Sequence, residues 1–351
     1  MRKLTLALGA AIVGLLCGEG VLRMLEPTTL GFDFVDGQFV QPVEFDKDVA
    51  ANRMGFHDVE HTEASRGLRR VLLLGDSYVA GHEVGVEDTV GRRLEAYLND
   101  ASGGAPGYEV ISMGRPGWGQ LQQLAALENW GPVFEPDLVV TLFLSLNDLV
   151  GNTPDLAVDK VRQTRRIDRV RPGWTGLRAP PPFLFVPSSR VNQLVAHRLA
   201  LARSGRTVDT IPFDYQAYRT EYTRPWQDAW ARTEQLILET RALASSWGGQ
   251  YRVVAASTPH GILGRAEGLT RLERVYPAMR ELSFDLDRVD DLLSDFCRQS
   301  SIEFLALEPL FRTRSKEVDE PLHYRYDGHW TREGHDFAAR LIANEILGAE
   351  P

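Results

Sequence analysis

Cysteine is scarce in this sequence, and its scarcity excludes two kinds of architecture. Cys17 and Cys297 are the only cysteines among 351 residues. A disulfide framework needs several paired cysteines, and a cysteine-based metal site needs closely spaced ones, so we expect neither. Basic residues are also in the minority, since 39 Lys and Arg stand against 48 Asp and Glu for a net charge of −9. Nucleic-acid-binding domains usually carry a basic excess, and we therefore expect no nucleic-acid partner.

Glycine motifs that hold phosphates are absent too. Neither GxxxxGKS/T nor GxGxxG occurs, and the zinc motif HExxH is missing as well. These absences predict a protein that needs no nucleotide cofactor and no metal ion. The remaining composition, with 43% hydrophobic and 25% charged residues, is typical of a globular protein.

The N-terminus begins with two positive charges and continues with an apolar run. Arg2 and Lys3 precede the uninterrupted apolar residues 4–17, and further apolar residues reach Leu25. Such a start is typical of a signal peptide or a membrane anchor. If Glu19 lies near the membrane interface, the whole stretch is long enough to span a bilayer.

We predict that residues 1–27 form an uncleaved single-pass anchor in the inner membrane. The best small-x-small cleavage site is Gly18-x-Gly20, which is weak. A cleaved signal peptide with secretion to the periplasm is the alternative, and a buried helix of a cytoplasmic protein is the third. The positive charges predict a cytoplasmic N-terminus. Residues 28–351 would then form one periplasmic domain.

Apolar runs and helical patterns alternate along the rest of the chain. Five short apolar runs predict strands, at 71–74, 108–112, 138–144, 252–256 and 303–307. Helical periodicity separates or follows them, at 88–98, 120–130, 225–247, 286–297 and 331–347. This alternation predicts an α/β fold, a three-layer α/β/α sandwich around a mostly parallel five-stranded sheet. Residues 28–66 are expected to be irregular, and the Pro-rich stretch 150–224 to be an inserted surface excursion.

Polar and glycine-rich blocks follow three of these strands, where ligands bind in open α/β sheets. Gly75-Asp76-Ser77 follows the first strand, and a serine there can act as a nucleophile beside backbone N–H groups. The second strand leads into the glycine-rich block 112–120, whose backbone can approach a ligand closely. The third leads to Asn147-Asp148, in which the amide is a suitable oxyanion donor. Each block alone is also compatible with a turn or a helix cap, and for the glycine block alone a plain turn is the favoured interpretation.

A nucleophilic serine needs a general base, and histidine is the usual one near neutral pH. Asp327-Gly328-His329 near the C-terminus offers a base together with a carboxylate that can orient it. His260, at another strand end, is a competing candidate. Asp76 and Asp148 are interpreted as carboxylates that brace their loops.

The order of these blocks resembles the SGNH (GDSL-type) hydrolase family over residues 71–347, and the resemblance implies an SGNH/flavodoxin-like sheet. The segments Glu19-x-x-Leu22-Arg23 and Asn52-x-x-Gly55-Phe56 resemble a membrane-anchored bacterial subgroup of it. The resemblance implies specific roles. The nucleophile would be Ser77, the base His329 and its orienting carboxylate Asp327, with an oxyanion hole made of the Ser77 and Gly117 N–H groups and the Asn147 side chain.

The chain departs from the family pattern at Ser112 and Ser145, where the family has Asn and Gly, and in its Asp-x-His spacing. Some polysaccharide O-acetyltransferases of the superfamily share this tighter spacing. We therefore expect a serine esterase that removes a short acyl group, acetyl above all, from an extracytoplasmic carbohydrate or lipid. An O-acyltransferase acting on a cell-envelope polysaccharide is one alternative, and a non-catalytic polysaccharide-binding or scaffold protein is the other.

Overall fold

The chain divides into two compact units, which are described separately. The computed structural model describes residues 2–25, 31–35, 38–43, 51–62, 67–101, 107–160, 211–324 and 328–348. The first unit comprises residues 1–46 and 164–207, and the second comprises residues 47–163 and 208–351. Most of the predicted excursion at 150–224 lies outside the described residues, and so does Asp327.

The first unit contains the N-terminal helix α1 (Arg2–Leu25) and a two-stranded hairpin. α1 includes the whole apolar run that was predicted to be an anchor. In the described part of the chain, no helix is long and apolar enough to cross a membrane.

The hairpin pairs β1 (Gly31–Val35) with β2 (Gln38–Val43) in antiparallel register, with Gly31 opposite Val43. The expectation of irregular structure over residues 28–66 is therefore wrong for these two strands. The signal was present in the sequence, because Asp36-Gly37 is a common two-residue hairpin turn between strand-forming segments.

The second unit is built on a five-stranded sheet whose strands all run parallel. Its order is β4-β3-β5-β6-β7. The strands are β3 (Arg69–Gly75), β4 (Tyr108–Gly114), β5 (Leu138–Phe143), β6 (Gln250–Ala255) and β7 (Glu303–Ala306). All five strands predicted from the sequence are present, and the predicted α/β fold class is confirmed.

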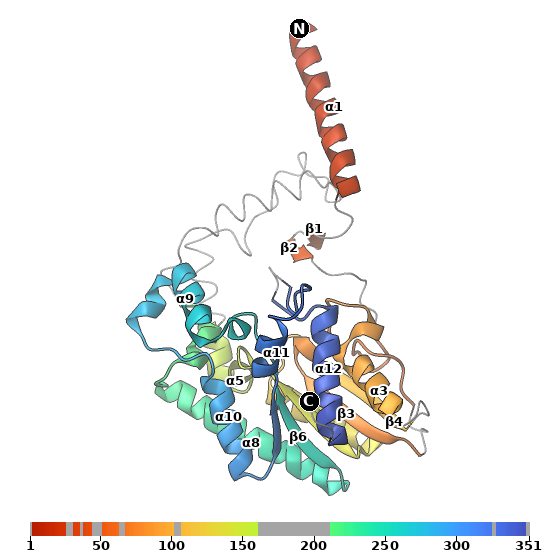
Figure 1. Cartoon of the computed structure of the whole chain (residues 1–351), viewed down its shortest axis with the longest axis vertical. Helices are drawn as coiled ribbons and strands as arrows, with labels where there is room; N and C mark the ends of the chain where they lie inside the picture. The colour runs from red at the N-terminus through yellow and green to blue at the C-terminus, as the bar shows by residue number, and fades with distance from the viewer. Residues whose placement is uncertain are drawn as a thin grey trace. The chain divides into compact units, whose positions relative to one another are not determined.

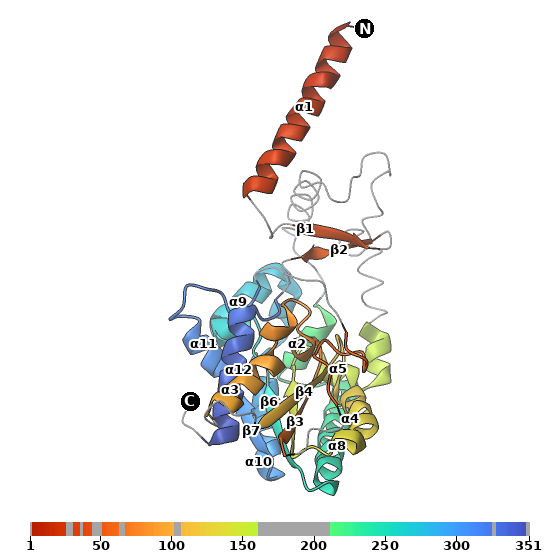
Figure 2. The same cartoon turned by 90° about the vertical axis from the view of Figure 1, so that its right-hand side faces the viewer.

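Helices cover both faces of this sheet. One face carries α3 (Val90–Ala101), α11 (Glu308–Arg314) and α12 (Arg332–Leu347), and the other carries α4 (Gln120–Phe134), α8 (Arg224–Ser246) and α10 (Arg288–Gln299). Figure 2 shows the three layers, with α3 and α12 on one side of the strands and α4 and α8 on the other. In Figure 1, α12 lies alongside α3, against which it packs. The described residues of the second unit also form the short helices α2 (Ser77–Ala80), η1 (Val86–Asp88), α5 (Asp148–Gly151), η3 (Phe213–Tyr218), η4 (Gly261–Leu263), α9 (Arg265–Val275) and η5 (Pro277–Glu281).

Successive residues of β3 belong to two different hydrophobic cores. Leu72 and Leu74 pack in the core that includes α4, α8 and α10, whereas Val71 and Leu73 pack in the core that includes α3 and α12. All four side chains are almost completely buried. A strand covered on both faces needs apolar side chains at every position, which explains the continuous apolar runs in the sequence.

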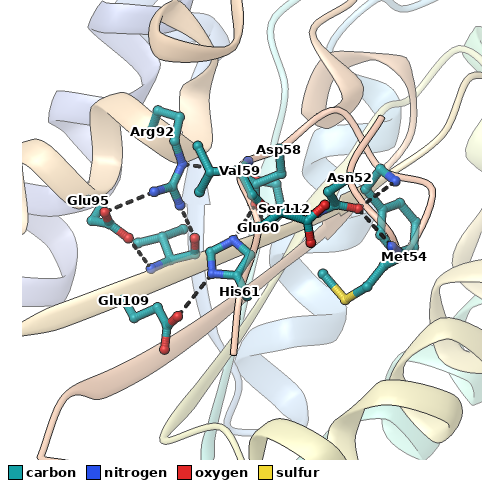
Figure 3. Close-up of polar contacts among 12 residues, drawn as sticks. Asn52, Met54, Asp58, Val59, Glu60, His61, Arg92, Glu95, Glu109 and Ser112 are labelled. Atoms are coloured by element: carbon teal, nitrogen blue, oxygen red, sulfur yellow. Dashed lines mark hydrogen bonds and ion pairs between the residues drawn. The ribbon is translucent and has the colours of Figure 1, made fainter. Parts of the chain in front are cut away.

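A buried network of charged side chains holds residues 51–62 against the sheet, ahead of β3. Figure 3 shows Asp58 next to both His61 and Arg92. His61 bonds Asp58 through Nε2 at 3.0 Å and Glu109 of β4 through Nδ1 at 2.9 Å. Because both ring nitrogens donate to carboxylates, His61 is an imidazolium ion here. The network therefore joins this segment to β4 and α3.

Candidate active site

The first predicted block forms a tight turn at the carboxyl end of β3. Ser77 begins the short helix α2, and the Asp76 side chain accepts a 3.0 Å hydrogen bond from the Tyr78 N–H. Gly81 ends this helix in the left-handed conformation, with φ +56°. His57 donates from Nδ1 to the Ala80 carbonyl at 2.8 Å, so the segment before β3 also supports this turn.

β4 leaves room for the turn because it ends at a glycine. Gly114 is paired with Gly75 at the end of β3. A Cβ atom on Gly114 would lie 2.6 Å from the Ala80 nitrogen and 2.8 Å from the Asp76 carbonyl oxygen. Backbone atoms cannot yield as a flexible side chain does, so a glycine is needed for the turn to pack this closely.

The structure brings the predicted nucleophile and base together. His329 Nε2 lies 2.8 Å from Ser77 Oγ, although 252 positions separate them in the sequence. The His329 ring lies 5.1 Å from the Tyr78 ring, measured between centroids, and the Tyr78 hydroxyl donates to the Gly328 carbonyl at 3.1 Å. The residue after the serine therefore fixes the loop that carries the histidine.

A carboxylate that the sequence analysis missed faces the other nitrogen of this histidine. Glu83 Oε1 lies 3.5 Å from His329 Nδ1, and the Glu83 side chain is 3% exposed. Asp327, the carboxylate predicted for this role, lies outside the described residues. Glu83 follows Ser77 by only six positions, but nothing in its local sequence distinguishes it from a surface glutamate.

Asn147 contacts the nucleophile turn directly. Its amide nitrogen Nδ2 donates to Asp76 Oδ2 at 2.9 Å. An amide nitrogen carries two hydrogens, so one remains for a substrate oxygen. A flipped amide would place its oxygen against the carboxylate, which fixes the orientation of the group. Among the described residues, the buried Oδ1 has no hydrogen-bond partner.

Gly117 lies in an exposed bend of the glycine block. It has φ +78°, a conformation that favours glycine, and no heavy atom lies within 4 Å of a Cβ built on it. In the described part of the chain, its N–H donates to no protein acceptor. The role of its N–H as an oxyanion donor stays a prediction.

Asp76 and Asp148 are both completely buried and brace the two loops. Asp148 accepts a 3.1 Å hydrogen bond from the Leu144 N–H and a bond from the Gln120 amide. Burial raises the pKa of Asp76, and the hydrogen bonds from Tyr78 and Asn147 oppose this rise. Burial and then the charge of Asp76 raise the pKa of Asp148 well above its usual value. The interpretation of both as bracing carboxylates agrees with these contacts.

Ser145, one of the departures from the family pattern, has a structural partner. Its hydroxyl lies 2.7 Å from the Tyr218 hydroxyl, and both residues are buried. This contact ties the loop that carries Asn147 to η3. A glycine at position 145 could not make it.

Two other histidines are candidates for the base, and neither is hydrogen bonded to Ser77 in the described structure. His335 is fully buried in α12, where its Nδ1 accepts from the Val90 N–H at 3.2 Å. Burial lowers the pKa of His335 to about 3. His260 packs against the Tyr215 ring, and burial lowers its pKa as well.

Metal-binding side chains do not cluster in the described part of the chain. No group of three or more His, Cys, Asp or Glu side chains there could hold a metal ion. Cys17 is exposed and Cys297 is buried, and both are free thiols.

Sequence comparison matches only the C-terminal part of the chain to a family. Residues 270–351 match the model described as "SGNH hydrolase-like domain, acetyltransferase AlgX". The matched part contains His329 but not Ser77. No curated protein matches the chain.

Several solved structures are similar to most of the chain. A lipase/acylhydrolase from Enterococcus faecalis has 15% sequence identity and a TM-score of 0.38, with 80% of this chain and 96% of that chain covered. An α/β hydrolase enzyme from the metagenome of Lake Arreo has 14% identity and a TM-score of 0.40, with 82% and 99% covered. The acetyl xylan esterase AlAXEase has 10% identity and a TM-score of 0.37, with 80% and 98% covered. All three are named as hydrolases or esterases.

Proposed function

We propose that this protein is a serine esterase that removes a short acyl group through an acyl-enzyme on Ser77. The observation that carries the proposal is the 2.8 Å contact between Ser77 Oγ and His329 Nε2. A serine hydroxyl hydrogen bonded to an imidazole is the arrangement that activates it as a nucleophile. Two carboxylates would orient the imidazole: Asp327, which the family resemblance supports, and Glu83, which lies 3.5 Å from His329 Nδ1.

The first half of the reaction forms the acyl-enzyme. Ser77 Oγ attacks the ester carbonyl carbon while its proton moves to His329 Nε2. The developing oxyanion would accept hydrogen bonds from the Ser77 and Gly117 N–H groups and from the second hydrogen of Asn147 Nδ2. His329 then protonates the leaving alcohol oxygen, and the carbon–oxygen bond of the ester breaks.

The second half returns the enzyme to its starting state. A water molecule gives a proton to His329 as its oxygen attacks the acyl carbon, and the same donors bind the second oxyanion. His329 returns the proton to Ser77 Oγ as the acid leaves. An alcohol acceptor in place of water would give a new ester instead.

The proposed substrate is an acetylated carbohydrate. Arg115 and Pro116 are exposed and directly precede Gly117, a proposed oxyanion donor, and the Arg115 guanidinium lies 5.8 Å from the Trp118 ring centroid. A polar, open approach of this kind suits a sugar ester better than a long acyl chain, which needs an apolar pocket.

A second candidate function is O-acyl transfer to a polysaccharide hydroxyl. It is favoured by the match of residues 270–351 to a model whose description names an acetyltransferase. The Asp327-Gly328-His329 spacing, which some O-acetyltransferases share, points the same way. Both functions use the same nucleophile and base, and they differ in the acceptor alone.

Covalent labelling tests the nucleophile. A fluorophosphonate probe should label wild-type protein at Ser77, and Ser77→Ala should lose the label and turnover while remaining folded by circular dichroism. Labelling at another serine would refute the assignment. No labelling and no ester turnover would favour the non-catalytic polysaccharide-binding alternative.

Product analysis separates the two enzyme functions. The protein is incubated with an acetyl donor and an oligosaccharide, and free acetate and acetylated sugar are compared by mass spectrometry. Free acetate should dominate, and rates should fall as the acyl chain of the donor lengthens. Acetylated sugar as the main product at modest acceptor concentration would replace the esterase with the transferase.

The cellular location is a further part of the proposal. Arg2 and Lys3 before the apolar run support a cytoplasmic N-terminus and an extracytoplasmic body. A C-terminal alkaline phosphatase fusion should therefore be active in cells. Recovery of the full chain from the soluble cytoplasmic fraction would contradict this location.

A further inference from the structure

We propose that Glu83 is a positioning residue for His329, an inference that rests on the proposed function. Glu83 lies between α2 and η1, on the chain segment that directly follows the nucleophile turn. Its Oε1 is 3.5 Å from His329 Nδ1, on the opposite side of the ring from Ser77. The imidazole thus lies between the serine hydroxyl and this carboxylate.

The Glu83 carboxylate is buried, so its contact with His329 affects the energy of both groups. The Glu83 side chain is 3% exposed, against 26% for His329. A buried carboxylate is costly without a charged or hydrogen-bonding partner, and an imidazole that becomes positive during the reaction is such a partner. The 3.5 Å separation is that of an ion pair, and hydrogen bonds of this kind are commonly long in the absence of substrate.

The backbone around Glu83 is tied to the histidine loop by Tyr324. The Tyr324 hydroxyl donates to the Glu83 carbonyl at 3.3 Å, and the Tyr324 N–H donates to the His329 carbonyl at 2.8 Å. The Gly328 N–H in turn donates to the Tyr324 carbonyl at 3.1 Å. One tyrosine therefore links both segments, so the position of the carboxylate relative to the ring does not depend on a single contact.

A carboxylate at Nδ1 would act in two ways. It favours the tautomer with hydrogen on Nδ1, which leaves Nε2 free to accept the Ser77 proton. It also stabilises the imidazolium that exists while each tetrahedral intermediate forms and breaks down. Glu83 could share this work with Asp327, since an Nδ1–H can be approached by more than one acceptor. We assign Glu83 a contribution to orientation and charge stabilisation, with no proton transfer of its own.

Other charged and titratable groups also act on His329 electrostatically. Asp76 adds negative charge when ionised, whereas His82, His323 and His335 add positive charge when protonated. Removal of Glu83 leaves all four in place. A change in the pH profile on its removal can therefore be assigned to Glu83.

The test compares Glu83→Gln with Glu87→Gln. Glu87 is an exposed carboxylate in the neighbouring helix η1, so its variant has the same change of charge outside the site. We expect Glu83→Gln to lower kcat/KM for an acetyl ester by about 10- to 100-fold with little change in KM. Fluorophosphonate labelling of Ser77 should slow by a similar factor. Glu87→Gln should behave like the wild type in both assays.

The pH profile of kcat/KM separates positioning from a merely structural role. Loss of a negative charge beside an imidazole disfavours its protonated form, so the acid limb should move to lower pH by about one unit in Glu83→Gln. An unchanged rate, or a slower rate with the acid limb in its wild-type place, would overturn the inference.

A second variant covers the case in which Glu83→Gln does not fold. Glu83→Asp keeps the charge but withdraws it from Nδ1 by one methylene. It should lower the labelling rate of Ser77 while leaving the acid limb near its wild-type position, and wild-type labelling by this variant would overturn the inference. The proposed function itself would be refuted if the wild-type protein neither labelled at Ser77 nor hydrolysed esters. If the wild type labels normally and the Glu83 variants label at the same rate, only the inference about Glu83 fails.

Discussion

The Asn147 side chain donates a 2.9 Å hydrogen bond to the Asp76 carboxylate, and this bond joins two strand ends. Asp76 precedes the proposed nucleophile at the end of β3, and Asn147 follows β5. The two strands are neighbours in the sheet, so their carboxyl ends lie at the same edge. The carboxylate that braces the nucleophile turn thus also orients the proposed oxyanion donor.

Removal of the Asn147 amide should affect the transition state above all. Asn147→Ala is expected to lower kcat by about two to three orders of magnitude with little change in KM, because the donor strengthens only as the oxyanion develops. Steady-state kinetics on an acetyl ester measure this. Asn99→Ala is the control, since Asn99 bonds the backbone near the start of β4. A change confined to KM would make Asn147 a substrate-binding residue instead.

The identity of the base can be tested against its competitor. His329→Ala should be nearly as severe as Ser77→Ala, because a nucleophile and its base act as a unit. His260→Ala should retain most activity, since His260 packs against Tyr215 and has no hydrogen bond to Ser77 in the described structure. Rates and thermal unfolding are measured for each variant. If folded His260→Ala lost more activity than His329→Ala, the general base would be His260 and not His329.

Gly114→Ala should disturb the nucleophile turn. The new Cβ would meet the Ala80 nitrogen at 2.6 Å and the Asp76 oxygen at 2.8 Å, both backbone atoms. Overpacking of this kind costs about 1–3 kcal/mol of unfolding free energy, and we expect kcat to fall with it. Gly20→Ala is the control, because Gly20, like Gly114, has no positive φ but has open space around its Cβ position. Equal stability losses in the two variants would show that close packing at Gly114 is unimportant.

The His61 network predicts a loss of stability at high pH. Burial lowers the pKa of His61, but the carboxylates of Asp58 and Glu109 outweigh it and raise the pKa to about 9, with Arg92 opposing them. The folded protein thus holds the proton more tightly than the unfolded chain, whose histidine titrates near 6.5. The resulting stability is fully present below pH 6.5 and is lost as pH rises through 9.

Urea unfolding of the wild type and His61→Asn at several pH values measures this contribution. The difference in unfolding free energy between them should shrink by an amount on the order of 3 kcal/mol between pH 6 and pH 10. A difference that stays constant over this range would show that His61 does not titrate as proposed.

Local sequence was sufficient for the strands and for the order of the site blocks. Strands β3, β4 and β5 consist of apolar runs because helices cover both faces of the sheet, so side chains on both faces of each strand are buried. Such continuous apolar runs can be recognised in the sequence. The hairpin at 31–43 could have been predicted from Asp36-Gly37 and its flanking residues. Parallel strands place their carboxyl ends at one edge, so Asp76 and Asn147 could be expected to meet there.

The partners of buried polar groups could not be predicted in this way. Glu83, His57 and His61 lie in short polar segments with no periodicity, and each would pass for a surface residue. Their burial results from the packing of the turns after β3 and the segment before it onto the sheet. Burial then decides which atoms they must contact, because a buried charge or donor without a partner is strongly unfavourable.

The sequence by itself determined the α/β architecture and the candidate chemistry of Ser77, Asn147 and His329. Only the tertiary structure decided that His329 Nε2 lies 2.8 Å from Ser77 Oγ and that Glu83 faces its other nitrogen. Strand runs depend on local burial and can be recognised in a few residues. A contact between residues 252 positions apart depends on the order of the strands in the sheet and on how the loop that carries His329 packs against the turn that carries Ser77. No local sequence pattern predicts this packing.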